Sequence, residues 1–225
     1  MSLLGIDTST AVAAACVLLD EGEAVEVAPD PAGLMRPPAH AGQLMPAVAD
    51  VMERAGVDWS ELDAIAVGVG PGSFTGLRIG IATARALAVA SRLRLRPVSS
   101  LAALARGIEE TEPGSAVLPL IDAKRGEVFA AAYDGGKELW GPFAAPPETL
   151  AERVREAEFA PLAAGDGSIR FRRVLETAGI RVAPECSGAH VVRALHVCRL
   201  AAATPGEPPE AVLPEYLRAP DAKPQ

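Results

Sequence analysis

The sequence predicts an α/β protein built from two repeated halves, and two observations carry that prediction. The first is a strand, a tight glycine turn and a helix in direct succession over residues 64–90. The second is an internal repeat between residues 3–23 and 118–138. Each copy has an apolar strand that ends at an aspartate, a polar turn, a second apolar strand and an acidic turn. Two copies are too few for a solenoid, so they indicate a duplicated α/β domain.

The repeat also sets the expected boundary between the halves. Ile6-Asp7 in the first copy aligns with Ile121-Asp122 in the second. Between the copies, Glu112-Pro113-Gly114 is the strongest break, because proline and glycine interrupt both helices and strands. A chain of 225 residues accommodates two halves of roughly 100 residues each. We therefore expect a first half over 1–112 and a second half over 113–225.

In the first half, the clearest amphipathic segment is a helix over residues 42–54. Its apolar residues recur on one face, Pro46 falls in its first turn, and Gly56 follows as a stop. Ser73 is the expected N-cap of the helix that follows the glycine turn. The elements expected after the hairpin are a proline-rich loop over 29–38, the helix over 42–54, a short turn over 60–62, a strand over 64–69, the helix from Ser73 and a helix over 101–108.

The second half is expected to repeat this plan. A turn over residues 165–168 leads into a helix that continues through Ala178. Beyond the last helix, prolines as far as Pro220 predict an extended tail, which Tyr216 and Leu217 anchor on a domain surface. The elements expected after the hairpin are a helix over 149–158, a strand over 160–164, the turn and helix over 165–178, a strand over 180–183 and a helix over 189–203.

Glycines crowd the segment from the first predicted core strand into its helix. Gly70-Pro71-Gly72 supplies backbone angles that residues with side chains resist. The pattern differs from a phosphate loop, because it lacks the P-loop lysine and its glycines run GxGxxxG, not GxGxxG. Gly76 and Gly80 lie one helical turn apart and give the helix a smooth face. This face predicts close packing, either against another element of the chain or against another protein.

Composition and charge narrow the classes of function. Hydrophobic residues make up 49% of the chain and aromatic residues 4%, so we expect cores of Ala, Val, Leu and Ile. A formal net charge of −8 opposes unaided nucleic-acid binding, and the arginines of the run Arg92 to Arg96 are expected on a solvated face. Three cysteines without CxxC spacing predict reduced thiols. Apolar stretches stay shorter than the ~20 residues that span a membrane and no signal peptide is expected, so we expect a cytoplasmic protein.

A family resemblance rests first on the glycine segment. That segment reads GPGSFTGLRIG, followed by ATARALA, and closely resembles the signature of the TsaB (YeaZ) family, a bacterial component of the tRNA threonylcarbamoyladenosine system. Four further segments resemble the family over nearly the full length: LLGIDTST, PVSSLAALA, LIDAKRGEVFAAAYD and LPEYLR. The resemblance implies the actin-like ATPase (ASKHA) fold of sugar kinases and heat-shock chaperones, in which each half opens with a β-hairpin.

In an actin-like fold, nucleotide lies in the cleft between the halves, and the resemblance implies which residues line it. Asp7 matches the aspartate of the first phosphate turn, but Ser9 stands where phosphate needs glycine. After Asp122, Lys124 and Arg125 put long side chains where phosphate needs bare backbone, and they suggest ion pairs with Asp122. We therefore expect weak or no ATP binding by the chain alone and no cofactor. The vestigial nucleotide cleft comprises Asp7, Thr8, Ser9, Thr10, Asp122, Gly165 and Gly167.

Enzymatic alternatives find less support in the residues. An actin-like-fold ATPase or small-molecule kinase is the alternative function, and the missing glycines weigh against it. A dinucleotide-binding domain lacks the acidic residue expected about 20 positions after the glycines. His40 stands alone, and His190 and His196 face different sides of a helix, unlike the HxxxH metal pair of the catalytic relative TsaD. Ser73 has neither a base nor an acid nearby in sequence, so we expect no catalytic residue and no metal site.

The resemblance implies a non-catalytic platform that supports threonylcarbamoyl transfer to the adenosine beside the tRNA anticodon. Such a subunit pairs with TsaD, recruits the ATPase TsaE, meets tRNA only within the complex and can form a homodimer when alone. A bulky residue at Gly76 or Gly80 is expected to abolish pairing and leave the monomer folded. The expected partner interface comprises His40, Leu44, Met45, Phe74, Gly76, Leu77, Arg78, Gly80, Ile81 and Arg85.

Overall fold

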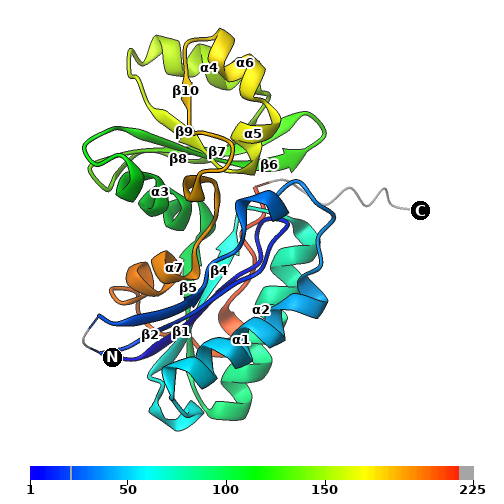
Figure 1. Ribbon diagram of the computed structural model, residues 1–225, viewed down its shortest axis with the longest axis vertical. Coiled ribbons are helices and arrows are strands. Elements are labelled where there is room, and N and C mark those ends of the chain that lie inside the picture. Colours follow the sequence, from blue (N-terminus) through cyan, green and yellow to red (C-terminus); the bar gives the residue numbers. More distant parts are fainter. Residues whose placement is uncertain (21, 218–225) are drawn as a thin grey trace.

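The computed structural model describes residues 1–20 and 22–217 and shows two α/β halves (Figure 1). Glu21 of the first acidic turn, and Arg218 and Pro220 of the tail, lie outside these residues. The described residues form two five-stranded sheets. The strands of the first sheet are β1 (Leu3–Asp7), β2 (Ala14–Leu18), β3 (Ala24–Val27), β4 (Ala64–Gly70) and β5 (Arg94–Ser99). The strands of the second sheet are β6 (Val117–Lys124), β7 (Glu127–Asp134), β8 (Lys137–Ala145), β9 (Leu162–Ala164) and β10 (Arg181–Val182).

The two sheets share one topology, which confirms the predicted duplication. The strand order is β3-β2-β1-β4-β5 in the first sheet and β10-β9-β6-β7-β8 in the second, so β6 takes the place of β1. β1 pairs antiparallel with β2 and parallel with β4, and β6 pairs in the same two ways with β7 and β9. Each half therefore opens with a hairpin whose first strand forms the centre of its sheet. Asp7 and Asp122 lie toward the ends of these two central strands.

Helices cover both faces of each sheet (Figure 1). The α-helices of the described chain are α1 (His40–Ala55), α2 (Phe74–Ser91), α3 (Ser100–Thr111), α4 (Pro147–Glu156), α5 (Asp166–Arg170), α6 (Arg172–Thr177) and α7 (Ala194–Ala201). Its short 3-10 helices are η1 (Pro31–Gly33), η2 (Trp59–Glu61), η3 (Gly188–His190) and η4 (Pro209–Ala211). Among the described helices, none combines the length and the apolar character needed to cross a membrane.

The described residues form three apolar cores between these layers. α1 and α2 close one core on the outer face of the first sheet, and α4 and α6 close another on the outer face of the second. α3 and α7 lie between the sheets, where their apolar residues form a single core with both. Neighbouring residues Leu3 and Leu4 of β1 belong to different cores, because successive side chains of a strand point to opposite faces. The shared central core couples the two halves.

The last helix of each half packs on the sheet of the other half. α3 follows β5 in sequence but packs mainly on β6 and β7, whereas α7 follows β10 and packs on β1 and β2. The chain beyond α7 stays with the first half, since Leu95 of β5 pairs with Glu207. The strands of the first sheet end at Ser99 and those of the second begin at Val117. The expected division into 1–112 and 113–225 stays a prediction.

Local structure follows the sequence closely in the first half. α1 buries its predicted apolar face and ends at Gly56, which has a φ of +62° in the left-handed region. The helix starts at His40, earlier than predicted, so Pro46 lies inside it and not in its first turn.

The second half shows two differences in its helices. The helix predicted to run through Ala178 breaks at Phe171 into α5 and α6. The helix predicted from residue 189 begins only at Ala194, because Val191 and Arg193 are extended. Just before this stretch, His190 closes the short helix η3, and its Nε2 lies 3.0 Å from Pro184 O.

Candidate partner interface and aspartate turns

The glycine turn joins β4 to α2 as the sequence predicts. Gly70 has a φ of +112°, a left-handed conformation that favours glycine. Ser73 caps α2, because its Oγ accepts a hydrogen bond from the Gly76 N–H at 3.2 Å. The Ser73 N–H donates to Ser9 O at 2.7 Å. The start of α2 therefore rests on the first hairpin turn of the same chain, residues 7–10, which we call the Asp7 turn.

Gly76 and Gly80 face the Asp7 turn and are buried. A Cβ on Gly76 would lie 2.0 Å from Thr8 O, and a Cβ on Gly80 would lie 2.2 Å from Thr8 Oγ1. The Thr8 hydroxyl donates to Gly76 O at 2.8 Å and fixes this contact. The prediction that these glycines offer a bare face to a partner is therefore wrong. Close packing within the chain is confirmed, because only glycine lets α2 approach the turn so closely.

Four further residues of the expected interface also lie inside the subunit. Leu44, Leu77 and Ile81 are 1%, 0% and 3% exposed, so they cannot form surface anchors. His40 is buried as well, burial lowers its pKa, and among the described residues neither of its ring nitrogens has a hydrogen-bond partner. Their role as contact residues is wrong because all four are buried within the subunit, and Leu44 and Ile81 belong to the core that α1 and α2 close on the first sheet.

The outward side of α1 and α2 keeps four residues of the expected interface accessible. Met45 is 45% exposed and Phe74 is 42% exposed. Arg78 is exposed, and Arg85 is half-buried. α1 and α2 contact each other along the outside of the first half, so these side chains lie on neighbouring helices (Figure 1). We call these four residues the α1–α2 face, and its use as an interface stays a prediction.

The carboxylate of Asp7 is bound within its own turn. Its Oδ1 accepts hydrogen bonds from Ser9 N at 2.8 Å and Ser9 Oγ at 2.6 Å, and its Oδ2 accepts one from Ser100 Oγ at 2.7 Å. Gly68 lies so close that a Cβ there would approach Asp7 Oδ2 to 1.8 Å. Burial raises the pKa of Asp7, and the hydrogen bonds from Ser9 and Ser100 partly oppose that rise. Thr8, Ser9 and Thr10 are buried around it.

The carboxylate of the second aspartate turn, Asp122, is paired with basic side chains. Lys124 Nζ pairs with Asp122 Oδ2 at 2.9 Å, and Arg170 approaches the same oxygen to 3.4 Å. The Lys124 N–H donates to Asp122 Oδ1 at 2.8 Å. Lys124 and Arg125 adopt left-handed φ angles of 63° and 55°. The predicted ion pair between Lys124 and Asp122 is confirmed, and together with the Lys124 N–H it engages both carboxylate oxygens of Asp122.

Both aspartate turns lead us to expect that ATP binds weakly or not at all to the chain alone. The side chains of Ser9 and Lys124 engage the two carboxylates within the subunit. Titration with magnesium and ATP in a calorimeter is expected to give no saturable heat in the micromolar range. Micromolar or tighter binding that is lost in an Asp7→Ala variant would contradict this expectation and support the alternative of an ATPase.

Gly165 and Gly167 pack against the central strand of the second sheet. A Cβ on Gly165 would lie 2.0 Å from Leu120 O, and one on Gly167 would lie 3.0 Å from the carbonyl carbon of Ile121. The Gly165 N–H donates to Nδ1 of the buried His190 at 3.0 Å. These glycines therefore allow α5 to pack closely on β6, just as Gly76 and Gly80 allow α2 to pack closely on the Asp7 turn.

The other candidate groups for metal binding or catalysis lie apart in the described structure. His196 lies on α7 with its Nε2 3.5 Å from Glu110 Oε2, and burial lowers its pKa to about 4. Cys16 and Cys198 are buried free thiols, and Cys186 is an exposed one. Within residues 1–20 and 22–217, no group of three or more His, Cys, Asp and Glu side chains is arranged to hold a metal ion.

Comparison with known proteins supports the family resemblance. A family model described as TsaD: tRNA N6-adenosine threonylcarbamoyltransferase matches residues 36–156, more than half of the chain. Two curated relatives, from Escherichia coli and Haemophilus influenzae, are described as tRNA threonylcarbamoyladenosine biosynthesis protein TsaB. They are 34% and 31% identical to this chain over 58% and 71% of its length. The alignments span 59% and 66% of the two relatives, less than two thirds of each.

A solved structure from Pseudomonas aeruginosa, described as an uncharacterized protein with similarity to peptidase YEAZ, matches the whole fold. It has a TM-score of 0.79 and 31% identity, and the match covers 96% of this chain and 99% of that chain. The chain belongs to the TsaB (YeaZ) family. Membership of the TsaB family confirms the actin-like fold that the resemblance implies, with two α/β halves that each open with a hairpin.

Two further features of this TsaB-family chain concern its tail and its second aspartate turn. The Tyr216 ring packs at a tilt against the Phe74 ring, with centroids 5.2 Å apart, which confirms the predicted anchoring of the tail at Tyr216. Sequence reasoning missed Asp166, which is 6% exposed and accepts a hydrogen bond from Asp122 N at 2.9 Å. Burial raises the pKa of Asp166 to about 6. The signal available in the sequence was an acidic residue between two glycines, Gly165 and Gly167, at a strand end.

Proposed function

We propose that this chain is a non-catalytic subunit of tRNA threonylcarbamoyladenosine biosynthesis in the cytoplasm and that it pairs with TsaD through the α1–α2 face. The curated TsaB relatives support the process, because their descriptions name this biosynthesis. The TsaD family model, which matches residues 36–156, supports pairing between two similar folds. In this proposal the pair recruits TsaE and meets tRNA only within the complex. The chain alone forms a homodimer through the same face.

The exposure of Met45 and Phe74 carries the proposal of an interface. Both are large apolar side chains, 45% and 42% exposed, on helices that contact each other. Arg78 lies over the Phe74 ring with its guanidinium carbon 3.8 Å from the ring centroid. Met, aromatic and Arg side chains are enriched at the centres of protein interfaces. A surface of this composition is suited to burial against a partner.

The two aspartate turns support a non-catalytic role. Asp7 is 2% exposed and holds hydrogen bonds from Ser9 and Ser100, and Asp122 is 7% exposed and paired with Lys124. An ATPase of this fold needs these carboxylates free to orient a cation and water beside the phosphates. Their engagement within the subunit favours a role in binding over a role in chemistry.

A charge placed on the α1–α2 face tests the proposal. Met45→Arg is expected to weaken binding to TsaD by ~10-fold or more, because it buries an unpaired charge at the contact. The thermal unfolding of the subunit is expected to change little, since Met45 points to solvent. Affinity is measured by titration, and a tRNA modification assay with and without this chain shows whether the process needs it.

Leu139→Arg is the matched control. Leu139 is 47% exposed and lies on β8 of the second half, so the same substitution there is expected to leave TsaD binding unchanged. If Met45→Arg still co-purifies with TsaD at full yield, the α1–α2 face is not the interface.

A further inference from the structure

The tail after α7 is fixed along the first half, beside α2 (Figure 1). Leu95 and Glu207 exchange two backbone hydrogen bonds, at 3.0 and 2.7 Å. Val212 is 1% exposed within the core beneath α1 and α2. Further along, the Glu215 N–H donates to Val69 O at 2.7 Å. The tail therefore forms part of the surface that α2 presents.

Between the tail and α2 lies a hollow of about 360 Å³, which we call the tail hollow. Ile81, Ala82 and Pro214 supply apolar wall, and the remaining lining comes from Arg78, Arg85 and Tyr216. The hollow exists only because the tail stands beside the helix, so no single element of the sequence predicts it. It directly adjoins the α1–α2 face, since Arg78 and Arg85 belong to both.

The two arginines at the tail hollow are fixed by neutral groups. Arg78 Nε donates to Tyr216 Oη at 3.1 Å while its guanidinium covers the Phe74 ring. Arg85 donates to the backbone carbonyls of Glu210 and Val212. Within the described part of the chain, neither arginine forms an ion pair with a carboxylate, although the protein carries a formal net charge of −8. The hollow thus combines apolar walls with two positive charges that form no ion pair with the described residues of the chain.

We propose that the tail hollow receives an apolar side chain of the TsaD subunit whose neighbouring residue is a carboxylate that pairs with Arg78. This inference rests on the proposed function and names the chemistry of the partner at that interface. An apolar anchor that fills a concave site is the usual centre of binding energy in an interface, and a rim of opposite charge fixes its register. Phe74 and Tyr216 complete the contact, because Tyr216 lines the hollow and its ring packs against the Phe74 ring.

Filling the hollow tests the apolar part of the proposal. Ala82 is exposed in the free chain, so Ala82→Phe occupies the hollow and is expected to weaken TsaD binding by ~10-fold or more without changing the thermal unfolding of the subunit. Ala90→Phe is the matched control, because Ala90 is also an exposed alanine of α2 and does not line the hollow. It is expected to bind TsaD like the unmodified chain.

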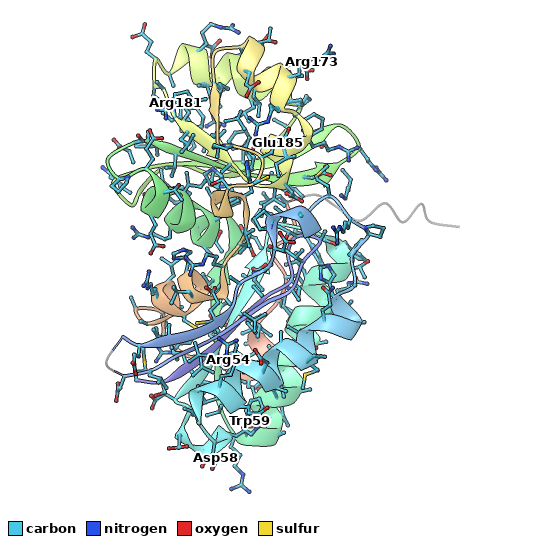
Figure 2. All side chains as sticks on the ribbon, viewed as in Figure 1. Arg54, Asp58, Trp59, Arg173, Arg181 and Glu185 are labelled. Atoms are coloured by element: carbon cyan, nitrogen blue, oxygen red, sulfur yellow. The ribbon has the colours of Figure 1, made fainter. Side chains whose placement is uncertain are left out.

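Removing a charge tests the carboxylate part. Arg78→Gln is expected to weaken binding by ~10-fold and to reduce its dependence on salt, because one ion pair across the interface is lost. Arg173→Gln removes the same charge from an exposed position on the second half (Figure 2). This control is expected to change neither the affinity nor its salt dependence.

The outcomes separate this inference from the proposed function. If Met45→Arg abolishes binding while Ala82→Phe and Arg78→Gln bind normally, the α1–α2 face is supported as the interface and the proposed occupant of the tail hollow is wrong. If all three variants bind normally, the proposed function fails together with the inference. If Ala82→Phe disperses a homodimer of the isolated chain but leaves TsaD binding intact, the hollow holds a second copy of this chain and the inference is overturned.

Discussion

Gly76→Ala is expected to destabilise the subunit by about 3 kcal/mol or more, because the new methyl group overlaps a backbone oxygen. Its Cβ would lie 2.0 Å from Thr8 O, and that oxygen cannot move without shifting the Asp7 turn and its hydrogen bond to α2. The free energy of unfolding, measured by urea titration, checks the expectation. A variant as stable as the unmodified chain would show that α2 does not rest on this turn.

A matched control separates this contact from the general effect of alanine in a helix. Gly42 lies in α1, where a Cβ would meet no heavy atom within 4 Å. Gly42→Ala is therefore expected to stabilise the protein by ~0.5–1 kcal/mol, because alanine favours helix and restricts the unfolded chain. A loss of stability in Gly76→Ala together with a gain in Gly42→Ala would show that the loss comes from the contact with the Asp7 turn.

Gly80 offers a sharper version of the same test. Its Cβ would lie 2.2 Å from Thr8 Oγ1, a side-chain atom, and the Thr8 Cβ is the next nearest at 3.4 Å. Thr8→Ala removes the hydroxyl, so it is expected to recover much of the stability lost in Gly80→Ala and little of that lost in Gly76→Ala. Two double-mutant cycles, one for each glycine with Thr8→Ala, measure this difference in recovered stability. They assign the overlap at Gly80 to the Thr8 hydroxyl and the overlap at Gly76 to the Thr8 backbone oxygen.

These glycines also show how far the sequence could predict the fold. The strand, turn and helix around them were predictable, since glycine spacing, the Ser73 cap and apolar periodicity are local signals. The duplication was predictable as well, because the two hairpins carry similar residues. The partner of a smooth helix face, in contrast, depends on residues that are distant in the sequence. Gly76 meets Thr8, which lies far away in sequence, and a local pattern cannot distinguish that contact from one with another protein.

The candidate surface was predictable only in part for a similar reason. Apolar residues on a helix indicate burial, but not whether a sheet of the same chain or a partner provides it. Leu44 and Met45 are neighbours in α1, yet the first is 1% exposed and the second 45% exposed. The tail hollow was beyond sequence reasoning, since it needs the position of Pro214 relative to Ala82. The exchange of α3 and α7 between the halves was missed for the same reason.

Asp166 is expected to make the stability of the protein depend on pH, because burial raises its pKa from 3.8 to about 6. A group whose pKa is higher in the folded state binds its proton more tightly there. Its stabilising effect is therefore fully present below about pH 4 and is lost as the pH rises through about 6. The ionised carboxylate is held 6% exposed beside Asp122, so neutral conditions impose the full cost of burying it.

Asp166→Asn removes that cost, since a neutral amide can still accept the hydrogen bond from Asp122 N. Relative to the unmodified chain, the variant is expected to gain roughly 2–3 kcal/mol between pH 4 and pH 7.5, because one unit of pKa corresponds to about 1.4 kcal/mol. Urea unfolding of both proteins across this range measures the difference and cancels contributions that they share. Asp50→Asn is the control, because Asp50 is an exposed member of a surface pair with Arg54, and its difference is expected to stay within ~0.5 kcal/mol. A difference for Asp166→Asn that does not change with pH would mean that the Asp166 carboxylate ionises as freely in the folded protein as in the unfolded chain.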